Sequence, residues 1–216
     1  MKKLLYKEFQ LSIHKFYFII PFLTGALFLI PQWVFLLALM YFFFISIPNI
    51  YSSYNSQNDN GFTIMMPVRK RDIVKAKILS VIILELLHII VGAFYAFLNV
   101  TLYKSGNFML DLNPAFFGIA FIMFAIFNIL FFPLYYKTAY NFGIPTILAT
   151  AAAIVFAAAV ELLVIFNAGF ANYLEGGSPQ MQSLQLVILL AGMIVFALSN
   201  FAAYRLSARR FENIDL

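Results

Sequence analysis

The chain has 216 residues, of which 63% are hydrophobic and 11% are charged, with a formal net charge of +5 and no cysteine. Soluble domains carry about a quarter charged residues because a folded surface must be hydrated, so this composition excludes an ordinary globular domain. The absence of cysteine excludes disulfide bonds and thiolate metal sites.

The apolar residues fall into six runs, each close to or above the roughly 20 residues that a helix needs to cross a bilayer. These runs are 16–30, 33–50, 78–103, 114–136, 144–166 and 184–204. They predict an all-α, polytopic membrane protein with six transmembrane helices, in which residues 1–216 form a single transmembrane domain.

Basic residues orient the predicted spans, because short loops rich in Lys and Arg stay in the cytoplasm. With a cytoplasmic N-terminus, thirteen of the fourteen basic residues fall inside and only Lys104 falls outside. We therefore predict that both termini are cytoplasmic. The basic excess is then a topology signal, and no basic face remains outside the membrane boundary for a nucleic-acid partner.

Residues 1–15 predict an amphipathic interfacial helix. Leu5, Phe9 and Ile13 recur at four-residue spacing with Lys3 and Lys7 nearby, so one face can enter the headgroup region while the other stays hydrated. The alternative is a frayed basic tail.

Three ionisable residues lie inside the predicted spans: Glu85, His88 and Glu161. Glu85 and His88 are spaced to share one helical face, as in di-iron bundle proteins. However, Glu85 lies roughly 10 Å into its span and Glu161 roughly 25 Å into a span that runs the same way, which separates the two carboxylates and argues against a metal site. An ionisable group in lipid costs about 2.5 kcal/mol or more, so these groups are functional candidates that face a cavity, a dimer interface or the nearer membrane interface.

Motifs for nucleotide or nucleophile chemistry do not occur in the sequence. Neither the phosphate-binding pattern G-x-x-x-x-G-K-[ST] nor the nucleophile pattern G-x-S-x-G is present, and the two histidines are far apart. We therefore expect that the chain is not an enzyme and does not hydrolyse ATP alone.

The longest predicted cytoplasmic segment is the loop 52–77. Asp59 or Asn60 is placed to cap a short helix that Pro67 ends. Apolar side chains have little reason to lie at such a loop tip unless they contact a cytoplasmic partner. Those in this short helix are Phe62, Met65 and Met66.

The stretch 66–77 reads Met-Pro-Val-Arg-Lys-Arg-Asp-Ile-Val-Lys-Ala-Lys. It resembles the Leu-Pro-Val-basic-basic-acidic-Ile-Val-x-x-Lys signature that follows the second span in permeases of type-2 ABC exporters, the short six-span kind without a fused ATPase. Met66 stands where leucine is common in that family. The stretch 5–9, Leu-Tyr-Lys-Glu-Phe, is similar to the family's entry helix, and the six-span pattern extends the resemblance over the whole chain.

The resemblance implies a permease subunit of an ATP-driven exporter in the bacterial plasma membrane. Two permeases would pair, as a homodimer or with a sister permease, and an ABC ATPase subunit that binds ATP and Mg would dock under each. The permease itself would hold no cofactor. The residues expected to couple it to the ATPase are Asn60, Gly61, Phe62, Met65, Met66, Pro67, Arg69, Lys70 and Arg71. For the three basic residues two roles are open, anchoring at the membrane interface and ion pairing with the ATPase.

Because ionisable groups inside the membrane seldom face lipid, we expect Glu85, His88 and Glu161 to line the substrate path or its gate. The segment 167–183 is too polar to cross the membrane again, and we expect it to form an extracellular cap with a short helix above Glu161. The alanines between 149 and 159 allow close helix packing, either between two permeases or within one.

An apolar conduit with only two internal acids suits a hydrophobic or amphipathic substrate, such as a membrane-active peptide. Two other functions are open. One is a non-transporting immunity or assembly factor. The other is a secondary transporter, which is weakened because no internal repeat is evident.

Overall fold

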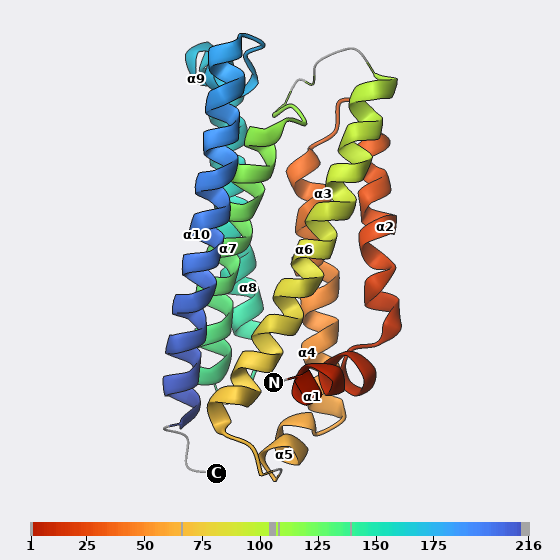
Figure 1. Ribbon diagram of the computed structural model, residues 1–216, viewed down its shortest axis with the longest axis vertical. Coiled ribbons are helices and arrows are strands. Elements are labelled where there is room, and N and C mark those ends of the chain that lie inside the picture. The colour runs from red at the N-terminus through yellow and green to blue at the C-terminus, as the bar shows by residue number, and fades with distance from the viewer. Residues whose placement is uncertain (1, 66, 104–106, 108, 139, 213–216) are drawn as a thin grey trace.

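The computed structural model describes residues 2–65, 67–103, 107, 109–138 and 140–212. In this part of the chain every regular element is helical, and the long helices stand side by side in one bundle (Figure 1). α1 (Lys2–Lys7), α5 (Asp59–Ile64) and the last turn of α10 (Pro179–Glu212) lie at one end of the bundle, whereas α9 (Ala168–Glu175) lies at the other. The predicted all-α fold is confirmed, while the side of the membrane that each end faces stays a prediction.

Five helical stretches are long and apolar enough to cross a membrane. The first, Phe35–Ser56, is continuous through α3 (Phe35–Tyr41), η4 (Phe42–Ser46) and α4 (Ile47–Ser56). The other four are single helices: α6 (Lys70–Leu102), α7 (Pro114–Lys137), α8 (Gly143–Phe166) and α10.

The first of the six predicted crossings is built differently from the others. α1 continues through η1 (Glu8–Ser12), and the chain then bends by 103° into a second stretch, which is the helical series η2 (Lys15–Phe18), α2 (Ile20–Gly25) and η3 (Ala26–Leu29). The bend falls where the backbone is extended, at Ile13 and His14, and His14 Nδ1 accepts a hydrogen bond from the backbone N–H of Phe16 at 3.2 Å. The bend therefore separates the predicted N-terminal segment 1–15 from the predicted span 16–30, which the helical series Lys15–Leu29 occupies. The fold has six apolar crossings if this bent pair makes one of them.

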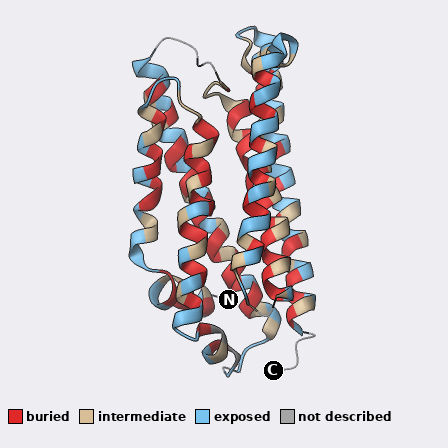
Figure 2. Cartoon of the chain, turned by 180° about the vertical axis from the view of Figure 1, so that it is seen from behind, coloured by how far each residue is buried: buried red, intermediate tan, exposed pale blue. Residues whose placement is uncertain are grey.

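Aromatic rings fill the interior around α7. Phe43 of η4 stacks on Phe127 of α7 with ring centroids 4.1 Å apart, and Tyr51 of α4 meets the rings of Phe131 and Tyr135 edge to face. All five side chains are fully buried. Among the five spans α7 is the most enclosed and α10 the most exposed. Figure 2 shows buried and exposed residues alternating along the long helices, as expected for helices that pack on one side only.

Two glycines bring α7 and α10 into backbone contact. A methyl group on Gly118 would lie 2.5 Å from the carbonyl oxygen of Ile188, and one on Gly192 would collide with the carbonyl oxygen of Gly118. Small residues let membrane helices approach this closely. The long, exposed α10 is therefore fixed to the bundle mainly through its seam with α7.

Gly192→Ala is expected to push α10 away from α7 and to lower stability, because overpacking a tight contact costs about 1–3 kcal/mol. Far-UV circular dichroism of the detergent-solubilised chain should show a lower apparent melting temperature. Gly177→Ala is the matched control, since no atom lies within 4 Å of the added methyl group. Equal melting temperatures for the two variants would mean that the α7–α10 seam yields without cost.

Candidate functional site

The loop between α4 and α6 reverses the chain and presents α5 at the end of the bundle (Figure 1). Asn58 adopts a left-handed backbone with φ 48°, and α5 begins at the next residue. The short helix expected here is confirmed. Phe62 lies within α5 and is 58% exposed, and Met65 follows its last residue and is 87% exposed. Pro67 and Arg69 are also exposed, and Gly61 is half-buried.

For two of the predicted coupling residues the structure gives no side-chain contacts. The side chain of Asn60 and the whole of Met66 lie outside the described residues. Their proposed contacts with an ATPase stay predictions.

Asp59 does not cap α5, and this part of the sequence interpretation is wrong. Its carboxylate is buried between two lysines, with one oxygen 2.6 Å from Lys7 Nζ and the other 2.8 Å from Lys77 Nζ. Ser12 Oγ donates a further hydrogen bond at 3.1 Å. A carboxylate out of water is stable only when it is paired, and two ammonium groups satisfy it better than the N-terminus of a short helix.

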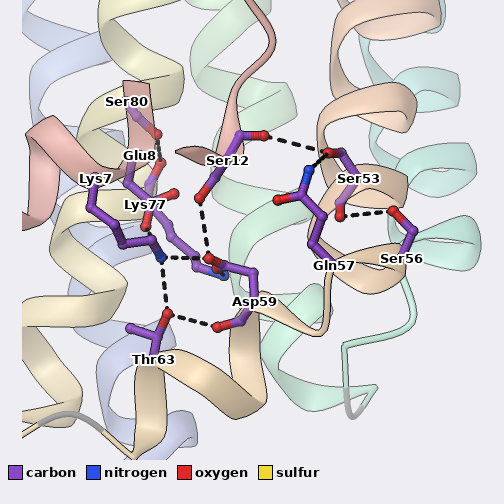
Figure 3. A network of polar contacts seen from close by, with 10 residues as sticks. All are labelled: Lys7, Glu8, Ser12, Ser53, Ser56, Gln57, Asp59, Thr63, Lys77 and Ser80. Carbon is purple, nitrogen blue, oxygen red and sulfur yellow. Dashed lines mark hydrogen bonds and ion pairs between the residues drawn. The ribbon is translucent and has the colours of Figure 1, made fainter. Parts of the chain in front are cut away.

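The same carboxylate belongs to a wider set of polar contacts, the Asp59 network, shown in Figure 3. Its ionic and hydroxyl members are Lys7, Glu8, Ser12, Asp59, Thr63 and Lys77. Lys7 Nζ also lies 3.0 Å from Glu8 Oε1 and donates to Thr63 Oγ1 at 2.9 Å, and Thr63 in turn donates to the carbonyl of Asp59 at 2.6 Å. The network therefore ties α5 to the N-terminal segment and to the start of α6.

The Asp59 network is buried but balanced in charge. Two lysines face two carboxylates, and Lys77 Nζ also stands 4.0 Å from the centroid of the Tyr54 ring. Burial alone would raise the pKa of the Asp59 carboxyl, but Lys77 and Lys7 outweigh burial and the pKa is lowered. The carboxylate is therefore ionised at neutral pH.

The N-terminal segment turns its charged side toward the protein. Lys7 and Glu8 are buried in the Asp59 network, whereas Tyr6 and Leu11 are exposed. The expectation that Lys7 stays hydrated is wrong, because Asp59 draws it inward. Of the predicted apolar face, Ile13 is buried in the core and Leu5 and Phe9 are half-buried, so this side packs partly on the bundle. Insertion of the segment into the headgroup region stays a prediction.

The basic residues that precede and open α6 make contacts within the chain. Arg71 forms a two-point ion pair with Glu212, at 2.5 Å from Nε and 2.9 Å from Nη2, and Lys70 Nζ lies 5.8 Å from the centroid of the Phe211 ring. These contacts fasten the start of α6 to the end of α10. The pairing of Arg71 with Glu212 was not among the roles that the sequence suggested for it.

Glu85 is fully buried and joins three helices. Its Oε2 accepts a hydrogen bond from Asn128 Nδ2 of α7 at 2.8 Å, and the same amide lies 3.0 Å from Asn200 Oδ1 of α10. This Glu85–Asn128–Asn200 bridge satisfies part of a polar cluster that would otherwise be costly inside the membrane, while Glu85 Oε1 and Asn128 Oδ1 have no hydrogen-bond partner among the described residues.

His88 is also buried but faces the opposite half of the bundle. Its Nε2 lies 3.3 Å from Thr24 Oγ1 of α2 and 3.4 Å from the carbonyl oxygen of Ala38 in α3. The structure therefore separates Glu85 and His88 into two sets of contacts, although they share a helix. In the described part of the chain no three acidic or histidine side chains come together to hold a metal.

Glu161 lies buried on α8 toward the end that carries α9. Its Oε2 accepts a hydrogen bond from the backbone N–H of Leu110 at 3.0 Å, and its Oε1 has no hydrogen-bond partner among the described residues. Glu161 also lines an apolar groove of about 400 Å³ between α3, η4 and α8, with Met40 and Leu162 among its walls. A buried acidic residue thus lines an apolar groove within the span α8.

Four residues that matter in these sites were not singled out from the sequence as site residues. Lys7 and Lys77 belong to the two stretches that resemble the family, and the sequence does not show that both pair with Asp59. Asn128 and Asn200 were visible as single polar residues inside apolar runs. A single polar residue in an apolar run predicts a buried hydrogen bond but does not identify the residue that shares it.

Comparison with known proteins adds a family to this geometry. The family model described as ABC-2 family transporter protein matches residues 3–211. The match covers all five spans almost to their ends, together with the bent N-terminal pair and α5. No curated protein and no solved structure matches the chain.

Asp59→Asn is expected to destabilise the loop end of the bundle, since it leaves Lys7 and Lys77 buried without a carboxylate. Removing one partner of a buried ion pair costs about 3–5 kcal/mol. We expect a lower melting temperature and faster tryptic cleavage around Arg69 and Lys70. Asp72→Asn is the control, because the half-buried Asp72 of α6 has no ion pair among the described residues.

The difference in melting temperature between the natural chain and Asp59→Asn should depend on pH, because the pKa of Asp59 is lowered in the folded protein. The contribution of such a group to stability is complete above the ordinary Asp pKa of about 3.9 and is lost as the pH falls through the lower folded value. The gap in melting temperature between the natural chain and Asp59→Asn should therefore stay constant between about pH 8 and about pH 5 and close only in stronger acid. A gap that closed near neutral pH would contradict the ion pairs described above.

Proposed function

The chain belongs to the ABC-2 family of transporter proteins and is a multi-pass membrane permease that associates with an ABC ATPase, and from that premise we propose that it is an exporter subunit. Its substrates are hydrophobic or amphipathic molecules, membrane-active peptides in particular, which leave a bacterial cell across the plasma membrane. Two permeases, identical or sister chains, form the path. The ATPase binds ATP and Mg²⁺ and supplies the energy.

The observation that carries this proposal is the exposed apolar pair on a fixed α5. Phe62 and Met65 project at the end of the bundle, while Asp59 and Thr63 on the buried side hold the helix in place. A pre-ordered apolar projection loses little entropy when it enters a groove on a partner, which suits a coupling helix. Arg69 and Pro67 follow directly and extend the contact surface.

The Asp59 network supports a route for the motion that ATP binding drives. If closure of the ATPases displaces α5, Asp59 must take Lys7 and Lys77 with it or leave charges buried and unpaired. The displacement then reaches α6, whose middle holds Glu85 and His88 in contact with α7, α10, α2 and α3. Interfaces of this kind switch between discrete packings, so a small shift at α5 can reorganise the bundle.

The groove beside Glu161 supports the substrate side of the proposal. An apolar groove lined in part by Glu161, whose buried Oε1 has no hydrogen-bond partner among the described residues, suits an amphipathic passenger that carries a positive charge once the site opens. Within its family the chain resembles the permease of the phenol-soluble modulin exporter, which agrees with a membrane-active peptide as substrate. We assign Glu161 to the gate at the end of the path that α9 covers.

The small residues of α8 support pairing with a second permease. Ala149, Ala153 and Ala157 are buried within the subunit, whereas Ala151 and Ala158 are exposed. The buried alanines allow close packing within one permease, and the exposed alanines are free for packing between two permeases. Exposed small residues let a second helix approach closely.

An immunity factor or a secondary transporter would have no need of a docking helix for an ATPase. The family match therefore supports the permease over both alternatives.

Phe62→Asp combined with Met65→Asp is expected to abolish docking of the ATPase, because two charges would enter an apolar contact. Co-purification of the ATPase with the tagged permease should be lost, and ATP hydrolysis by the reconstituted complex should fall to the level of the ATPase alone. Asn141→Asp is the control, since it adds a charge to another exposed loop. Undiminished co-purification of the double variant would show that α5 is not the coupling helix.

Glu161→Gln is expected to reduce export of a cationic amphipathic peptide from proteoliposomes by about tenfold, the effect of roughly 1.4 kcal/mol of lost charge attraction. The ATPase should still dock. Glu175→Gln is a closely matched control, because Glu175 accepts a backbone hydrogen bond from Asp111 as Glu161 does from Leu110, yet it does not line the groove. Equal losses in the two variants would remove Glu161 from the substrate path.

A further inference from the structure

A second apolar groove, of about 440 Å³, lies between α6 and α10, and Phe121 of α7 also lines it. Its two walls are stripes with helical spacing, Ile78, Ile82 and Leu86 on α6 and Met193, Ala197 and Phe201 on α10. From Lys75 to Leu86 the groove extends about 16 Å along α6 at 1.5 Å per residue, close to the depth of about 15 Å of one hydrocarbon leaflet.

The deep part of this groove offers little polarity to an occupant. Asn200 contributes to the wall, but its amide nitrogen donates to the carbonyl of Phe196 and its oxygen accepts from Asn128. Glu85 is fully buried behind these contacts and does not line the groove. The wall therefore fits an apolar chain.

The end of the groove near the start of α6 is cationic. There it meets a cavity of about 430 Å³ whose lining includes Arg71, Arg205 and Arg209, and Phe201 and Tyr204 line both spaces. Lys75 stands at the same end of the groove. Of these four cations, only Arg71 forms an ion pair with an acidic residue of the described chain. The pocket thus keeps a surplus of positive charge.

We propose that this groove binds one anionic phospholipid, with an acyl chain along the α6 and α10 stripes and the phosphate between Arg205 and Arg209. Three features select this occupant: the groove has the depth of one leaflet, its apolar part lies within the membrane spans, and its charge changes to positive where the helices end. A cationic peptide would be repelled by the arginines. A second copy of the chain related by twofold symmetry would bring the same arginines together.

The bound lipid bridges two helices that meet at this end through the pair Arg71–Glu212. It therefore holds the start of α6 against the end of α10, next to the segment that carries α5. Anionic lipid is therefore a bound structural component of the permease, in addition to forming the membrane around it.

Brominated lipids test the proposal in the full chain reconstituted in bilayers. Tyr204→Trp puts a fluorophore where the two cavities meet, and Trp33→Phe removes the single native tryptophan. Brominated phosphatidylglycerol should quench the introduced fluorophore at a lower mole fraction than brominated phosphatidylcholine does. Arg205→Gln or Arg209→Gln should each reduce that preference by about fivefold, since a basic group near the surface contributes about 1 kcal/mol to anionic lipid binding.

Charge-matched controls separate this site from general attraction to the membrane. Lys15→Gln and Lys137→Gln remove exposed charges that do not line either cavity, and they should leave the preference intact. Equal quenching by the two lipids, or a preference that survives both arginine changes, would overturn the proposal.

Filling the groove tests the apolar part independently of the arginines. Ala197→Phe should reduce quenching by brominated phosphatidylglycerol, whereas Ala191→Phe, on an exposed part of α10 outside the groove, should not. Far-UV circular dichroism and size-exclusion profiles equal to those of the natural chain establish folding of each variant. Displacement of the lipid by an amphipathic peptide, but not by phosphatidylcholine, would assign the groove to the transport path and overturn the lipid assignment. Displacement by inorganic phosphate would reduce the site to a headgroup pocket and overturn it as well.

Discussion

The carboxylate of Asp59, held between two lysines, is the interaction on which the loop end of the bundle depends. A buried ion pair contributes little net stability compared with apolar packing, yet removing one partner is costly, because the other charge stays buried. Its effect is therefore to specify geometry. Lys7 and Lys77 belong to segments far apart in the sequence, and a single acid fixes both to α5. The buried polar side of α5 is therefore held in a defined position relative to the N-terminal segment and α6.

α6 carries that constraint along the length of the bundle. Lys77 joins its start to α5, Glu85 joins its middle to α7 and α10, and His88 joins the next turn to α2 and α3. Near its far end, Asn99 donates to the carbonyl of Phe28 at 2.7 Å. Polar contacts of this kind have few alternative partners in an apolar surrounding, so each fixes a register between helices. The apolar rings around α7 supply close packing, while the polar contacts of α6 determine which packing is adopted.

The spans could be predicted from the sequence, because the need to satisfy backbone groups in lipid makes a long apolar run helical whatever its neighbours are. α7 and α8 end close to the predicted boundaries for this reason. The bend between the N-terminal segment and the first crossing falls at the predicted boundary, but its angle could not be predicted, since it depends on how His14 caps the following turn and on contacts of Lys7. Asp59 was read as a cap because local capping is the only partner visible in one stretch of sequence. Its actual partners are set by tertiary structure, as are those of Asn128 and Asn200.

Buried carboxylates at the two ends of the bundle have different kinds of partner. Thirteen of the fourteen basic residues lie in segments that the predicted topology assigns to one side, so a buried acid there can pair with lysine, as Asp59 does. Toward the α9 end cations are scarce, and Glu161 and Glu175 accept hydrogen bonds from the backbone N–H groups of Leu110 and Asp111 instead. One backbone N–H satisfies one oxygen and leaves the carboxylate without a counter-ion. A topology that keeps cations on one side thus leaves the buried Glu161 without a counter-ion, which is why its assignment to the substrate gate is a proposal about charge as well as about position.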